Sequence, residues 1–135
     1  MDISMLGRGA ATERIDKWRA DGAKAVGIIC CHVPFELLHA AGIFPVRLRA
    51  TGCSDNSTGG AYLGDSCCSF AKSLLQRLMD GTYKLDGVVA SNGCTVADMI
   101  FVNYNSLCSR EGREQFLREI DAPRMSNESS QKYFG

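Results

Sequence analysis

The chain has 135 residues, of which 45% are hydrophobic and 22% are charged, and its 15 basic and 15 acidic residues leave no net charge. These proportions are typical of one globular domain and not of a disordered chain. A balanced charge removes the electrostatic attraction that nucleic acid or an anionic membrane would exert, so we expect neither as the main partner. The sequence shows no signal-peptide pattern and no run of about 20 apolar residues, so we expect a cytoplasmic protein.

Short apolar runs alternate with helix-like segments along the chain. Strands are predicted over residues 25–30, 45–49, 86–91 and 120–123, and helices over residues 10–24, 35–41, 67–79, 96–104, 111–118 and from 127 onward. Residues 51–64 are rich in Gly, Ser, Asn and Asp and predict a loop. The alternation predicts an α/β fold, a Rossmann-like parallel sheet of about four strands with helices on both faces. We expect residues 1–135 to form a single domain, the N-terminal part of a longer protein.

Seven cysteines are many for this length, and they stand at positions 30, 31, 53, 67, 68, 94 and 108. An odd number without a secretion signal argues against a disulfide framework. No CxxC motif occurs, which excludes zinc-ribbon and thioredoxin-type sites. Most of these cysteines can serve as small buried hydrophobic residues, but several lie at the ends of predicted elements.

Cys68 and Cys94 occupy the positions best suited to binding a metal cluster. Cys68 opens a predicted helix for which Asp65 or Ser66 could be the cap, and Cys94 follows the third strand, just before a helix that Thr95 could cap. A helix N-terminus favours the thiolate, which is the form that binds metal. An iron–sulfur cluster needs about three or four ligands, so further ligands would have to come from elsewhere. Burial in the core is the competing interpretation for both thiols.

Polar residues near the expected ends of the first two strands are further candidates. Cys31 and His32 end the first strand and could face a substrate or simply lie at the surface. Glu36 falls in the first turn of the next helix, where a carboxylate also favours the helix dipole. Arg47 and Arg49 could bind phosphate groups or remain solvated. Neither a glycine-rich phosphate loop nor a GxSxG nucleophile motif is present.

Four sequence blocks, taken in order, resemble the 2-hydroxyacyl-CoA dehydratase and benzoyl-CoA reductase family. Residues 25–48 combine a strand, a V-P-x-E helix start, A-A-G and P-V-R-L. The next blocks are residues 68–73, residues 85–89 leading to Cys94, and residues 120–124. The similarity runs from about residue 15 to residue 134 and corresponds to the N-terminal part of a family member.

The resemblance implies a subunit with an oxygen-sensitive 4Fe-4S cluster held by three cysteines, of which two match Cys68 and Cys94. It further implies an acyl-CoA substrate, a homologous second subunit and an ATP-hydrolysing iron–sulfur activator protein that delivers one electron. The dehydratases eliminate water from a 2-hydroxyacyl-CoA through a ketyl radical. Cys31 stands where relatives often have Ser or Thr near the substrate, and with Glu36 it is expected to be catalytic. Thr95 follows Cys94 where many relatives have an aspartate.

The resemblance leaves two alternatives to a dehydratase subunit. One is a benzoyl-CoA-reductase-like subunit or a double-cluster electron-transfer protein. The other is a noncatalytic scaffold or interaction subunit that keeps the fold but binds no cluster. In each case the isolated 135-residue chain is expected to be inactive, and the full-length protein would be a lyase or a CoA-ester reductase.

Overall fold

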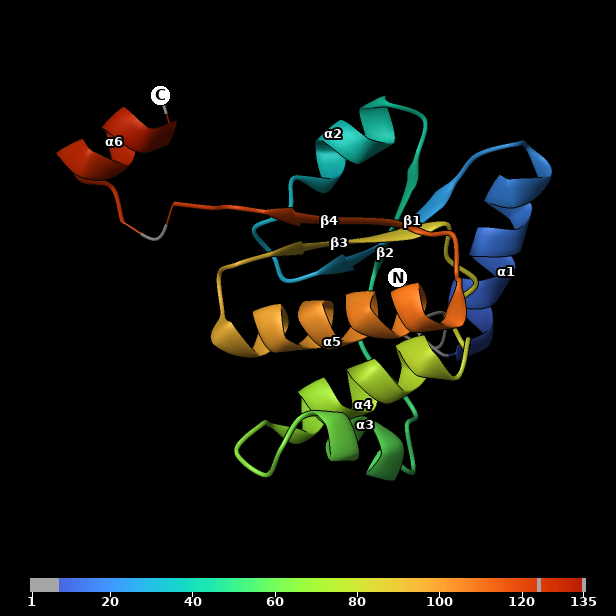
Figure 1. Cartoon of the computed structure of the whole chain (residues 1–135). Helices are drawn as coiled ribbons and strands as arrows, with labels where there is room; N and C mark the ends of the chain where they lie inside the picture. Colours follow the sequence, from blue (N-terminus) through green and yellow to red (C-terminus); the bar gives the residue numbers. More distant parts are fainter. Residues whose placement is uncertain (1–7, 124, 135) are drawn as a thin grey trace.

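The computed structural model describes residues 8–123 and 125–134 as one four-stranded parallel sheet with helices (Figure 1). The strand order is β2-β1-β3-β4, and every neighbouring pair is parallel. The strands are β1 (Ala25–Ile29), β2 (Phe44–Arg47), β3 (Gly87–Ser91) and β4 (Phe116–Ile120). The helices are α1 (Arg8–Ala20), α2 (Phe35–Ala40), α3 (Ser57–Tyr62), α4 (Ser69–Met79), α5 (Thr95–Glu111) and α6 (Glu128–Phe134). None of these helices is both long and apolar enough to span a membrane.

Strands β1 and β3 are the two central strands of the sheet, and every residue in both is buried. Their sequences, AVGII and GVVAS, have the continuous small and apolar character that a parallel strand covered on both faces requires. A Cβ atom at Gly87 would collide with the backbone carbonyl of Phe116, so glycine there permits the close approach of β4. The edge strands β2 and β4 are partly exposed.

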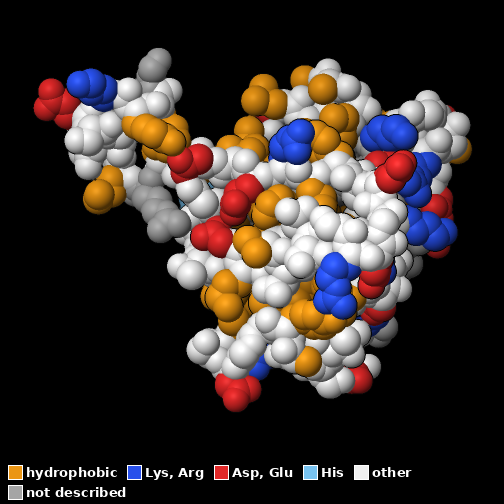
Figure 2. Space-filling view, viewed as in Figure 1, with side chains coloured by type: hydrophobic (Ala, Val, Ile, Leu, Met, Phe, Trp, Pro, Cys, Tyr) orange, Lys and Arg blue, Asp and Glu red, His pale blue; other side chains and the backbone are white. Residues whose placement is uncertain are grey.

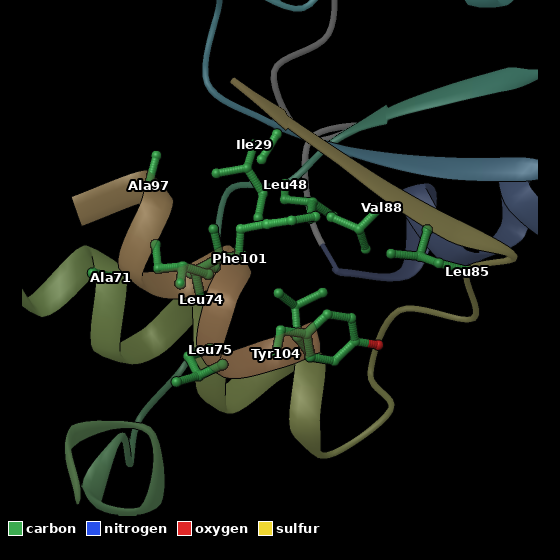
Figure 3. Close-up of a cluster of buried hydrophobic side chains, with 14 of the residues drawn as sticks. Ile29, Leu48, Ala71, Leu74, Leu75, Leu85, Val88, Ala97, Phe101 and Tyr104 are labelled. Atoms are coloured by element: carbon green, nitrogen blue, oxygen red, sulfur yellow. The ribbon is translucent and has the colours of Figure 1, made fainter. Parts of the chain in front are cut away.

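Each face of the sheet carries its own apolar cluster. The larger one joins the sheet to α4 and α5, and Leu74, Leu75 and Ile100 are among its fully buried members (Figure 3). The smaller one lies on the opposite face. There Val33, just before α2, and Leu38, within α2, pack with Val26 and Ile28 of β1 and Val89 of β3. Figure 1 shows α2 on one side of the sheet and α4 and α5 on the other, as the sequence predicted.

Helix α3 lies within the segment that the sequence predicted to be a loop, and this prediction was wrong. Gly59 is buried, and a Cβ atom there would collide with the backbone carbonyl of Lys72 in α4. Its amide donates a hydrogen bond to the side-chain oxygen of Gln76 at 3.0 Å. The glycines of this segment therefore allow close helix packing, although their number suggested only flexible turns.

The C-terminal elements also differ from the prediction. Residues 111–118 do not form a helix, because α5 continues to Glu111 and ends at Gly112, whose φ of 63° suits glycine. The fourth strand is β4, which pairs with β3 from Phe116 to Ile120, whereas the sequence placed a strand at residues 120–123. No residue of β4 is fully buried, and Phe116, Arg118 and Glu119 are exposed, so this edge strand has a weak apolar pattern. The Arg118 guanidinium lies 5.2 Å from the Phe116 ring centroid.

The order of the strands creates a topological switch point between β1 and β3. After β1 the chain turns to α2 on one face and returns as β2, and after β3 it turns to α5 on the opposite face and returns as β4. The two connections therefore diverge beyond the carboxyl ends of β1 and β3. Ligands of open α/β sheets bind at such points.

Asp86, which directly precedes β3, connects this strand to α1 and β1 at the amino end of the sheet. Its carboxylate accepts hydrogen bonds from Arg19 at 2.8 and 3.3 Å and from the Ala25 amide at 2.9 Å, and Lys24 lies 3.8 Å away. Partial burial opposes ionisation, but these donors outweigh it and lower the pKa of Asp86.

We expect Asp86→Asn to lower the free energy of unfolding by about 1–2 kcal/mol at neutral pH, because charge-assisted hydrogen bonds are lost. A carboxyl group with a lowered folded-state pKa stabilises the fold above its unfolded-state pKa and loses this effect as pH falls through the folded-state value. Urea unfolding of variant and parent should therefore differ at pH 7 and converge in acid. Asp16→Asn, which removes a more exposed pair with Lys84 at 3.7 Å, is the control and should cost much less.

Candidate functional site

The segment after β1 changes direction at Cys30, whose φ is +79°. A residue with a Cβ atom rarely adopts this left-handed conformation, and such strain is concentrated at functional sites. Because the left-handed turn ends the alternation of the strand, side chains from consecutive positions can gather on one side. Ile29 and Val33, which flank the turn, are both buried and hold it in place.

Cys30, Cys31 and His32 gather into one group beyond β1. One possible ligand atom from each of the three lies within 4.8 Å of the others, and the Cys30 Sγ is 3.6 Å from the His32 Nδ1. Cys30 is partly buried, whereas Cys31 and His32 are exposed. Gly93, beyond β3, leaves the space for this arrangement, because a Cβ atom there would collide with the imidazole and lie 3.4 Å from the Cys30 sulfur.

The surroundings of Cys30 favour its thiolate. Burial of the sulfur opposes ionisation, but the His32 backbone, the Ser91 hydroxyl and the imidazole outweigh this and lower the pKa of Cys30 to about 7. The Ser91 side chain is completely buried, and its hydroxyl has no conventional hydrogen-bond partner among the described residues. The Ser91 hydroxyl can therefore donate its hydrogen to the thiolate of Cys30.

Cys68 and Cys94 are the N-cap residues of α4 and α5. Both thiols are exposed, and neither makes a side-chain hydrogen bond to its own helix. The caps that the sequence suggested, Asp65 or Ser66 for one helix and Thr95 for the other, are therefore wrong, since each of these residues lies beside or before the cap. The thiols remain available to other partners at positions where a helix favours negative charge.

The two helices begin at the same end of the sheet, the end at which β1 and β3 terminate (Figure 1). A contact of 3.8 Å between the Cys67 Sγ and the Met99 Sδ joins the start of α4 to the second turn of α5. Cys67 is buried, with 6% of its surface exposed, while its neighbour Cys68 faces solvent. All seven cysteines are free thiols in the structure.

The other residues that the sequence suggested for the site, Glu36, Arg47 and Arg49, are not part of the group formed by Cys30, Cys31 and His32. Glu36 is exposed in the first turn of α2. Arg47 and Arg49 are exposed and line, with Leu48 and Phe70, a shallow cavity of about 370 Å³. Phe70 belongs to the first turn of α4, so this cavity adjoins the helix end that carries Cys68.

Acidic side chains gather near the end of β4 and the start of α5, on the face seen in Figure 2. Burial raises the pKa of Glu119, and the carboxylates of Asp98 and Asp121 raise it further. The Asn92 amide donates to the Asp121 carboxylate, and its oxygen accepts from the Ala122 amide at 2.9 Å. Asn92 thus fastens the chain beyond β4 to the end of β3.

Sequence reasoning missed Cys30, Ser91 and Gly93 as parts of this edge. Cys30 was interpreted as a small buried residue because the sequence does not reveal a positive φ. Gly93, directly after a buried strand and before a helix, was the signal in the sequence for close packing between the ends of β1 and β3.

Fold and site together define an α/β domain that presents cysteine thiols at the switch point of a parallel sheet. The chain belongs to the family described as 2-hydroxyglutaryl-CoA dehydratase, D-component, whose family model matches residues 30–135. This match confirms the family resemblance found in the sequence.

Two curated relatives are similar to this chain. The beta subunit of (R)-2-hydroxyglutaryl-CoA dehydratase from Acidaminococcus fermentans is 33% identical over 79 residues, which are 58% of this chain and 21% of the relative. The (R)-phenyllactyl-CoA dehydratase beta subunit of Clostridium sporogenes is 32% identical over 74 residues, which are 54% of this chain and 20% of the relative. The matched region thus spans about a fifth of the length of each relative.

Proposed function

We propose that this chain is part of a subunit of an oxygen-sensitive iron–sulfur 2-hydroxyacyl-CoA dehydratase, and that Cys68 and Cys94 are two ligands of its 4Fe-4S cluster. The observation that carries the proposal is the placement of two exposed thiols as N-caps of adjacent helices in a member of this family. The match to dehydratase beta subunits favours dehydration over the reductase, electron-transfer and scaffold alternatives.

The residues present fit such a cluster. Thiolates are the usual ligands of iron–sulfur clusters, and both sulfurs lie where the free amides of a first helical turn favour negative charge. Neither thiol is committed to capping its helix. A third cysteine would lie far downstream in the full-length subunit. When bound, the cluster would supply one-electron transfer and an open iron that acts as a Lewis acid.

The chain's own residues would bind and orient the acyl-CoA. Cys31 is exposed at the carboxyl end of β1 and would contact the hydroxyl or carbonyl end of the acyl group. Glu36, in the first turn of α2, would transfer a proton during the loss of water. Arg47 and Arg49, which border the shallow cavity beside α4, would meet the phosphates of the coenzyme. A homologous second subunit and an ATP-hydrolysing activator complete the proposed enzyme.

The test is to purify the protein without oxygen and measure iron and acid-labile sulfide. We expect about four of each per chain, together with the loss of water from a 2-hydroxyacyl-CoA when the partner subunit, the activator, ATP and Mg²⁺ are present. A folded protein without iron would overturn the cluster assignment. Iron without dehydration, but with reduction of an aromatic acyl-CoA, would favour the reductase alternative.

A further inference from the structure

We propose that Cys30, Cys31 and His32 form a separate binding site for a thiophilic divalent metal ion of the zinc class. The site lies beyond β1 and uses none of the ligands assigned to the iron–sulfur cluster, so the inference does not depend on the proposed dehydratase function. Among residues 8–123 and 125–134, no other group of three or more Cys, His, Asp or Glu residues has ligand atoms close enough together to hold one ion.

The distances match those of a tetrahedral metal site. Zinc bonds of about 2.3 Å to sulfur and about 2.0–2.1 Å to nitrogen place these two ligand atoms about 3.5–3.6 Å apart. The Cys30 Sγ and the His32 Nδ1 are separated by 3.6 Å. The Cys31 sulfur lies within 4.8 Å of the Cys30 sulfur and of a ring nitrogen of His32, and its side chain is exposed.

The backbone holds these ligands together before any metal binds. The positive φ of Cys30 directs consecutive side chains toward one point, and the buried Ile29 and Val33 anchor the turn at both ends. Gly93 keeps open the space that the imidazole occupies. Such preorganisation reduces the conformational entropy that metal binding would otherwise cost.

The buried Ser91 hydroxyl is a further polar group beside the Cys30 sulfur. Its side chain is completely buried, and the thiol of Cys30 is the neighbour to which it can donate. A hydroxyl in this position would donate to a metal-bound thiolate, and such outer contacts orient ligands and strengthen metal affinity.

The donor set defines the class of ion and the character of the site. Two sulfurs and one imidazole suit Zn²⁺ and Co²⁺ and disfavour Mg²⁺ and Ca²⁺. Three protein ligands with exposed sides leave a fourth position for solvent or another ligand, which is the pattern of an open zinc site. If Cys31 also contacts the acyl group as proposed above, metal and substrate would compete for its thiol.

The experiment uses the full-length protein carrying Cys68→Ala and Cys94→Ala, so that cluster thiols cannot contribute. Anaerobic titration with Co²⁺ should give thiolate-to-cobalt charge-transfer absorption that saturates at one equivalent and disappears when Zn²⁺ is added. Cys30→Ser, Cys31→Ser and His32→Asn, each added to this background, should weaken binding at least tenfold. Ser91→Ala and Gly93→Ala should weaken it about tenfold or more by acting on the surroundings of the ligands.

Cys53→Ser and His39→Asn are matched controls, because both residues lie outside the group, and cobalt binding should be unchanged. Circular dichroism and thermal unfolding establish that each variant is folded; Gly93→Ala should fold because the atoms it displaces belong to the exposed imidazole and the Cys30 side chain. No charge-transfer band in the folded background protein would overturn the proposal, as would binding that persists in Cys30→Ser and His32→Asn. Iron content of the unsubstituted protein is measured separately, so failure of this site and failure of the cluster assignment are distinguishable.

Discussion

Replacing Cys68 with alanine is expected to remove nearly all cluster iron, whereas replacing its neighbour Cys67 is expected to leave the iron in place. Cys68 presents an exposed sulfur at the N-cap of α4, while the Cys67 sulfur is buried against Met99. A thiol enclosed in the core cannot reach a cluster without unfolding the start of the helix. Cys94→Ala should behave like Cys68→Ala, because Cys94 holds the corresponding position on α5.

The adjacent pair makes this test specific. Iron and acid-labile sulfide are measured after anaerobic purification of each variant, and circular dichroism establishes that the fold is kept. Cys67→Ala should cost about 1 kcal/mol of stability through its lost packing and still retain iron. Full iron in Cys68→Ala, or equal loss in both variants, would contradict the assignment of Cys68 as a ligand.

Of the substitutions considered, Leu74→Ala is expected to lower the free energy of unfolding most, by about 3–5 kcal/mol. Leu74 is completely buried in α4, where it packs between the sheet and the neighbouring helices (Figure 3). Removing a fully buried leucine side chain leaves a cavity that the surrounding structure fills only in part. Because α4 also carries Cys68 at its amino end, a loosened helix should hold a cluster less firmly.

Urea unfolding monitored by circular dichroism measures this loss as a lower midpoint with an unchanged slope. Leu37→Ala is the matched control: Leu37 lies on α2 with 68% of its surface exposed, and its truncation should change stability by less than about 0.5 kcal/mol. Equal midpoints for Leu74→Ala and the parent would show that the packing of α4 contributes little to the fold.

The parts of the fold that were predictable are those in which one physical pattern dominates. Strands β1 and β3 are buried on both faces, so their unbroken apolar sequences indicated central parallel strands. The helix predicted over residues 67–79 likewise agrees with α4, Ser69–Met79, to within two residues. The edge strand β4 was misplaced because an exposed face dilutes its apolar pattern, and α3 was missed because its glycines serve packing and not flexibility.

The candidate site was predictable where position along an element decides the chemistry. The thiols at the starts of α4 and α5 could be recognised from the sequence because a helix start follows a loop or a strand end. The arrangement around Cys30 could not, since it depends on a positive φ and on an imidazole that lies over Gly93, a residue of a different strand connection. Contacts between residues so far apart in sequence become visible only in three dimensions.

The all-parallel sheet has a consequence for how the thiols are protected while the chain folds. Helical connections separate strands that are consecutive in sequence, so no two strands pair as a local hairpin, and such non-local pairing is slow. During that time seven thiols are accessible to oxygen and to one another, and thiolate exchange can join cysteines that the native fold keeps apart. We therefore expect the chain to refold in higher yield with a thiol reductant than in air.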